Sequence, residues 1–89
     1  SSPKIAHISE LVLSYNERWD GLGYPRGLSG EEIPLLSRLF SIINTYDTML
    51  YRDVQYKNPK TKEEAIEELE RCAGTQFDPN LVKEIVKII

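Results

Sequence analysis

Histidine and cysteine are almost absent from this sequence. Its 89 residues include one histidine, His7, and one cysteine, Cys72. A single cysteine cannot close a disulfide within the chain, and sites built on histidine and cysteine need several ligands at fixed spacing. The sequence therefore excludes a disulfide scaffold and a zinc module, and it favours a reducing compartment, so we expect a cytoplasmic protein.

Excess positive charge and long hydrophobic runs are also lacking. The net charge of -3 gives no electrostatic reason to bind nucleic acid, which relies on Lys and Arg neutralising phosphates. No apolar run approaches the roughly 18 residues of a membrane-spanning helix. With 40% hydrophobic and 28% charged residues, the chain is expected to form a small globular domain or part of one.

Regular structure should break between residues 21 and 30, a segment with four glycines and one proline. Gly21 and Gly23 permit backbone angles that are closed to other residues, and Pro25 pushes Tyr24 toward an extended conformation. Trp19 and Tyr24 add two large rings, the usual anchors of interfaces. Three charged residues come just before the glycines: Glu17, Arg18 and Asp20. We interpret this stretch as a shaped loop that holds charges against a partner, a metal or a helix end.

Periodicity predicts an all-α chain of about four helices and no strand. The expected ranges are residues 3–18, 34–51, 61–74 and a last helix from residue 79. Thr61 and Asp78 are expected caps of the last two helices. Ser29 and Glu32 have capping-box spacing, which leaves two alternatives: one helix starts at Gly30, or a short turn precedes a helix from Pro34.

The helix over residues 34–51 is apolar around most of its circumference, which predicts that it is buried. Its polar residues fall on one stripe at spacings of three and four: Ser37, Ser41, Asn44 and Asp47. Buried polar groups are usually hydrogen-bonded, so internal hydrogen bonds are the preferred interpretation and a lined site is the alternative. A small basic cluster follows and could meet a phosphate, although a solvated loop is the more ordinary interpretation: Arg52, Lys57, Lys60 and Lys62.

Several segments resemble the HD-GYP family of bacterial HD-domain metal phosphohydrolases. The similarity begins with the run from Glu17 to Pro25, ERWDGLGYP, and continues through residues 27–34, Arg38, residues 44–47, Glu64-Ala65 and residues 74–79. The resemblance implies a helical fold, two or three metal ions, usually iron or manganese, and hydrolysis of cyclic di-GMP to pGpG or GMP. The resemblance covers the C-terminal half of the family's domain. We therefore expect residues 1–89 to form one partial domain, with the glycine-rich loop at residues 20–30. The helices that carry the family's His-Asp pair are expected to precede Ser1.

The sequence departs from that family where the resemblance places metal ligands. Tyr15 and Asn16 stand where the family has two adjacent histidines, and Asn44 stands where it has an aspartate. A phenol and neutral amides are poor substitutes for imidazole and carboxylate ligands. We therefore expect no metal and no iron or manganese cofactor in this chain, and no catalytic activity from it alone.

Two functions follow from the resemblance. The first is a degenerate HD-GYP module that binds a protein, such as a GGDEF domain or an upstream HD half, or binds cyclic di-GMP without cleaving it. The alternative is part of an active cyclic di-GMP phosphodiesterase whose N-terminal HD half lies outside this chain. The apolar helical faces also predict self-association. The candidate binding residues are Glu17, Trp19, Asp20, Gly21, Gly23, Tyr24, Pro25, Asn44, Asp47 and Arg52.

Overall fold

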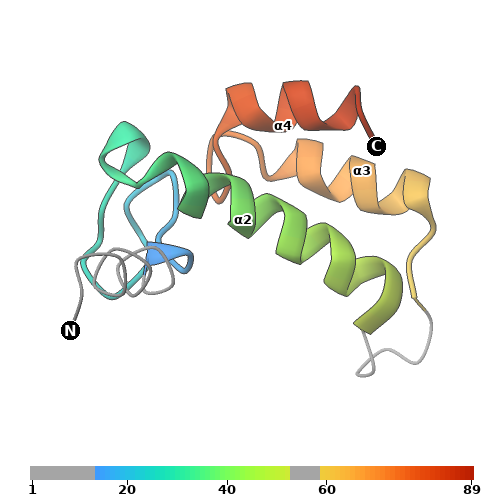
Figure 1. Ribbon diagram of the computed structural model, residues 1–89, viewed down its shortest axis with the longest axis horizontal. Coiled ribbons are helices and arrows are strands. Elements are labelled where there is room, and N and C mark those ends of the chain that lie inside the picture. Colours follow the sequence, from blue (N-terminus) through green and yellow to red (C-terminus); the bar gives the residue numbers. More distant parts are fainter. Residues whose placement is uncertain (1–13, 53–58) are drawn as a thin grey trace, which may run out of the picture.

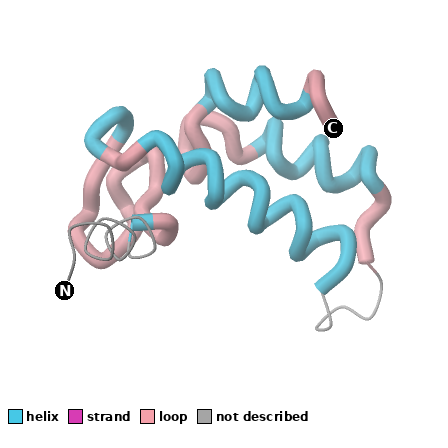
Figure 2. The backbone as a smooth tube through the Cα atoms, in the orientation of Figure 1, coloured by secondary structure: helices cyan, strands magenta, loops and turns pink. Residues whose placement is uncertain are grey.

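A computed structural model describes residues 14–52 and 59–89 of the chain, with the side chain of Arg52 also outside the description. Five helical elements lie within these ranges: η1 (Gly30–Glu32), α2 (Leu35–Asp47), the π-helix η2 (Thr48–Arg52), α3 (Lys62–Arg71) and α4 (Pro79–Val86). The described part contains no strand, only an isolated bridge between Ala73 and Phe77. The prediction of an all-α fold is confirmed (Figures 1 and 2). None of the helices in residues 14–52 and 59–89 is long and apolar enough to cross a membrane.

The helix starts follow the local chemistry of the sequence. Thr61 caps α3, because its hydroxyl accepts the Glu64 N–H at 3.1 Å while the Glu64 carboxylate accepts the Thr61 N–H at 2.9 Å. Asp78 caps α4, with Pro79 in the first turn. Ser29 opens only the single turn η1, after which Pro34 starts α2. Of the two alternatives for this region, the short turn followed by a helix is correct.

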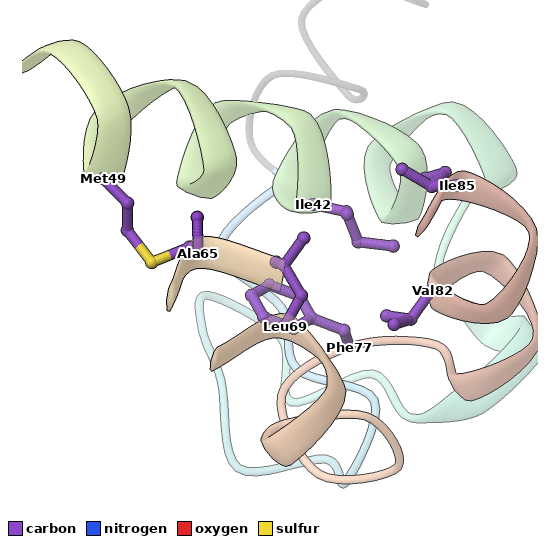
Figure 3. Packing of buried hydrophobic residues seen from close by; sticks show 7 residues of the cluster. All are labelled: Ile42, Met49, Ala65, Leu69, Phe77, Val82 and Ile85. Carbon is purple, nitrogen blue, oxygen red and sulfur yellow. The ribbon is translucent and has the colours of Figure 1, made fainter. Parts of the chain in front are cut away.

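The core lies on one side of α2. Helices α3 and α4 pack next to each other against that side (Figure 1). Figure 3 shows the apolar side chains that meet between the three helices: Ile42, Met49, Ala65, Leu69, Phe77, Val82 and Ile85. Fully burying one large apolar side chain stabilises a fold by about 1.5–3 kcal/mol, so this cluster is the main source of stability in the described part.

The opposite side of α2 contradicts the prediction that this helix is buried all round. Leu36, Phe40 and Ile43 remain 56%, 52% and 50% exposed. Their spacing of four and three residues places them on one face of the helix. The apolar composition of a helix face predicts that the face packs against another segment, but it does not identify that segment.

The first predicted helix also ends earlier than its pattern indicates. Residues 3–13 of that prediction lie outside the described residues, and Ser14 is the last helical position before a turn at Tyr15 and Asn16. The backbone N–H of Trp19 donates to the Gln76 carbonyl at 3.2 Å, and that of Asp20 donates to the Thr75 carbonyl at 2.9 Å. The apolar spacing that extends to Trp19 predicted helical hydrogen bonds for these N–H groups, and the tertiary bonds take their place.

An ion pair joins the start of α2 to the start of α4. Arg38 Nη1 lies 2.7 Å from Asp78 Oδ2, and the side chains are 15% and 4% exposed. Arg38 Nε also donates to the Ile33 carbonyl at 2.9 Å. The other Asp78 oxygen, Oδ1, accepts the backbone N–H groups of Asn80 and Leu81. Both ions are thus held by further hydrogen bonds, which is the condition for a favourable pair away from water.

We predict that Arg38→Met lowers the free energy of unfolding by about 3 kcal/mol, because it leaves the Asp78 carboxylate buried without its counter-ion. Arg71→Met is the matched control. Arg71 pairs with Glu68 at the surface, where the two side chains are 68% and 35% exposed, and an exposed pair contributes about 1 kcal/mol or less. Urea unfolding of both variants measures the difference. Equal losses would contradict the role given to the Arg38–Asp78 pair.

Candidate functional site

The buried carboxylate of Glu17 organises the glycine-rich loop. Its side chain is 4% exposed. Oε2 accepts the backbone N–H of Arg26 at 2.8 Å, and Oε1 accepts that of Leu28 at 3.0 Å. A carboxylate that accepts two backbone N–H bonds holds both donors more firmly than a neutral acceptor would. Glu17 thereby folds the loop back onto its own start.

Gly23 lies directly on the backbone that precedes the loop. A Cβ atom at this position would stand 2.4 Å from the Asn16 carbonyl oxygen and 2.5 Å from the Arg18 nitrogen. Any residue other than glycine would fit here only if the loop at Gly23 or the backbone at residues 16–18 moved. The next residue, Tyr24, donates its N–H to the same Asn16 carbonyl at 3.4 Å and precedes Pro25 in a cis peptide bond.

The other two charges before the loop neutralise each other. Arg18 Nε and Nη2 donate to the two oxygens of Asp20 at 3.1 and 3.0 Å. The hydrogen bond from Arg18 is the main reason that the pKa of the Asp20 carboxyl is lowered and that of Arg18 is raised. Asp20 Oδ1 also accepts the Leu22 N–H at 3.0 Å. The charges expected to face a partner are therefore largely engaged within the loop.

A pocket of about 210 Å³ opens between this loop, α2 and the segment before α4. Its lining residues are Tyr15, Asn16, Glu17, Arg18, Ser41, Asn44, Thr45 and Gln76. The Tyr15 ring stands edge-on to Phe40, with centroids 5.4 Å apart and planes at 89°. The Thr45 hydroxyl donates to the Ser41 carbonyl at 2.8 Å. The pocket is thus lined mainly by hydroxyl and amide groups.

The structure gathers only some of the predicted site residues. Glu17 and Asn44 line the pocket together with Tyr15 and Asn16, so the three departures from the family pattern meet in one place. Five candidates lie in the loop outside the lining: Trp19, Asp20, Gly21, Gly23 and Pro25. Tyr24 is 65% exposed at the loop tip. Asp47, toward the far end of α2, does not belong to the lining, and the side chain of Arg52 lies outside the described part of the chain.

Two interpretations were given for the polar stripe of α2, internal hydrogen bonds and a lined site, and different residues of the stripe fit each one. Ser41 and Asn44 line the pocket, whereas Ser37 is buried, 1% exposed, outside it. Thr45 and Gln76 were missed as lining residues. Gln76 lies within the matched segment 74–79, but only the tertiary bond from Trp19 to its carbonyl shows that this segment reaches the loop.

The residues present do not fit the metal centre that the resemblance implies. In the described part of the chain no three His, Cys, Asp or Glu side chains cluster closely enough to hold an ion. Glu17 is the single carboxylate among the lining residues, and both its oxygens bind loop N–H groups. The remaining side chains are neutral except for Arg18, which would repel a cation.

Comparison with known proteins gives a consistent family assignment. A model of the HD domain family matches residues 1–81. A cyclic di-GMP phosphodiesterase of Thermotoga maritima is 40% identical over 88 residues, which are 99% of this chain and 24% of the relative. A probable cyclic di-GMP phosphodiesterase of Vibrio cholerae is 41% identical over 73 residues, 82% of this chain and 16% of the relative.

A solved structure shows the same fold. The crystal structure of a cyclic GMP-AMP specific phosphodiesterase from Vibrio cholerae superimposes with a TM-score of 0.76 at 31% identity. The alignment covers 91% of this chain and 18% of that one. The chain thus spans about a quarter or less of the length of these relatives.

We predict that Glu17→Gln loosens the loop, because an amide nitrogen cannot accept the backbone N–H that one carboxylate oxygen now binds. Hydrogen bonds to charged groups contribute about 1.5–3 kcal/mol, so stability should fall by about 2 kcal/mol. Amide hydrogen exchange at Arg26 and Leu28 should accelerate. Glu31→Gln, at an exposed position of η1, is the control and should change neither quantity. Unaltered exchange in Glu17→Gln would refute the organising role of this carboxylate.

Proposed function

This chain belongs to the HD domain family, in its HD-GYP branch, and on that premise we propose that it is a degenerate HD-GYP module of bacterial cyclic di-GMP signalling. It binds a protein or the nucleotide without cleaving a phosphodiester. It works in the cytoplasm, the compartment favoured by its single cysteine.

The observation that carries this proposal is the meeting of Tyr15, Asn16 and Asn44 in one pocket. Metal-dependent hydrolysis needs an ion that lowers the pKa of a bound water and neutralises charge on the phosphate. Neutral phenol and carboxamide groups hold such an ion poorly. The fold and the glycine loop are retained around this pocket, which supports binding without hydrolysis.

The names of the relatives support a cyclic dinucleotide as the small ligand. Two classes of substrate are named among them, cyclic di-GMP and 3'3'-cGAMP. Guanine is common to both. A guanine-containing cyclic dinucleotide is therefore the ligand that we assign to this module.

The tip of the glycine loop supports a protein partner. Leu22 and Tyr24 are 79% and 65% exposed, while the adjoining backbone is fixed by Glu17, Asp20 and the Asn16 carbonyl. A rigid tip with exposed apolar side chains loses little conformational entropy on binding. We assign the tip to a GGDEF domain, and the exposed face of α2 to an upstream HD half or a second copy of the chain.

The metal-free state is tested with Tyr15→His, Asn16→His and Asn44→Asp combined. We predict that the unmodified protein takes up no iron or manganese and does not hydrolyse cyclic di-GMP, and that the triple variant gains metal. The control, Tyr51→His with Asn80→Asp, adds similar groups at exposed positions away from the pocket and should gain none.

Metal content after dialysis and nucleotide turnover are the two measurements, repeated in a longer form of the protein that carries any upstream HD half. If the unmodified protein binds two metals and turns over cyclic di-GMP, the proposal is wrong and the chain is part of an active phosphodiesterase.

The loop tip is tested with Tyr24→Ala. Aromatic anchors dominate interface energies, so affinity for a GGDEF domain should fall at least tenfold, a change of about 1.4 kcal/mol. The melting temperature should stay unchanged, since Tyr24 is exposed. Tyr51→Ala, at a position 77% exposed on η2, is the control for loss of a surface ring. A large fall in melting temperature with intact binding would assign Tyr24 to the fold instead.

A further inference from the structure

We propose that the pocket beside the loop binds the hydrogen-bonding edge of a guanine base, in the place where the family is expected to hold metal. The inference rests on the proposed function in taking a guanine-containing cyclic dinucleotide as the ligand. It adds which part of that ligand enters the pocket and which side chains recognise it.

The pocket has the size of one ring system. Its volume of about 210 Å³ exceeds the roughly 10–15 Å³ that one water requires. It is below the roughly 300–1,000 Å³ of sites that enclose a drug-sized ligand. A single base therefore fits, while the rest of a cyclic dinucleotide remains outside.

The charges at the pocket disfavour an ionic ligand. Arg18 is held in a two-point pair with Asp20, so a phosphate would have to compete for it. Glu17 uses both oxygens for the loop N–H groups of Arg26 and Leu28. A cation at either oxygen would compete with these bonds and weaken the hold on the loop, so an uncharged polar group is the ligand that fits best.

Three carboxamides supply the recognition. Asn16, Asn44 and Gln76 line the pocket from three segments and are only partly buried. Their side chains make no hydrogen bond within residues 14–52 and 59–89, although no polar side-chain atom of this part is buried without a partner. Their amides are therefore accessible to solvent and can exchange water for a ligand.

The donors and acceptors of these groups match guanine. Each carboxamide offers one acceptor oxygen and two N–H donors. The hydroxyls of Tyr15 and Ser41, also in the lining, can donate or accept. Guanine presents acceptors at O6 and N7 and a donor at its N2 amino group. A site that offers both donors and acceptors can bind both kinds of group on this base.

The test titrates guanosine, which carries no phosphate, into isotope-labelled protein and follows the side-chain NH₂ signals of Asn16, Asn44 and Gln76 by NMR. We expect all three to shift. Inorganic phosphate and Mn²⁺, added separately, should leave them unmoved. Asn44→Leu, which keeps the approximate size but removes the amide, should weaken guanosine binding about tenfold, while Asn80→Leu at an exposed position of α4 should not.

Static NH₂ signals up to the solubility limit of guanosine would overturn the inference, as would shifts caused by phosphate alone or an Asn44→Leu variant with unchanged affinity. If cyclic di-GMP or a GGDEF domain binds while the three side-chain NH₂ signals do not shift, the inference that the pocket binds a base is wrong and the proposed function stands. Metal uptake with turnover of the nucleotide would instead overturn the proposed function, whatever guanosine does.

Discussion

The contact between the Glu17 carboxylate and two N–H groups of the glycine loop is the constraint on which the site depends. A buried anion costs several kcal/mol unless it is paired or hydrogen-bonded, and here both of its oxygens accept backbone donors. The loop must therefore close over Glu17, and Gly23 is required where it crosses the preceding backbone. The same contact engages the single carboxylate of the pocket lining within the loop.

The C-terminal part of the chain supports this loop and completes the pocket. The carbonyls of Thr75 and Gln76 accept the N–H groups of Asp20 and Trp19, and Gln76 also joins the pocket lining. Just beyond them, Asp78 caps α4 and pairs with Arg38 of α2. One short segment thus joins the loop, the core helices and the pocket.

The helix caps could be predicted from the sequence, whereas the contacts between distant segments could not. The caps at Thr61 and Asp78 were predicted because the bonding groups lie within a few residues of each other. The first helix was predicted too long because the N–H groups of Trp19 and Asp20 bond to Gln76 and Thr75, which lie far along the chain. The burial expected for Phe40 failed for a similar reason, since α3 and α4 pack on the other side of α2.

The pocket was partly predictable. The resemblance singled out Tyr15, Asn16 and Asn44, and the structure shows that these three residues line one pocket. Neither periodicity nor motif spacing indicated that Gln76 would join them, or that the charges of Arg18 and Asp20 would be engaged with each other. On our proposal, this chain differs from the pattern that the resemblance implies by a change of donor chemistry within a retained fold.

The most direct test of the account is a titration of paramagnetic Mn²⁺ into isotope-labelled protein. A bound Mn²⁺ ion broadens the NMR signals of nearby nuclei beyond those of exposed surface groups. We predict that the backbone amide signals of Asn16 and Asn44 broaden no more than that of the exposed Asn80. Selective loss of the Asn16 and Asn44 signals at low Mn²⁺ concentration would show that the pocket still binds metal and would contradict the account.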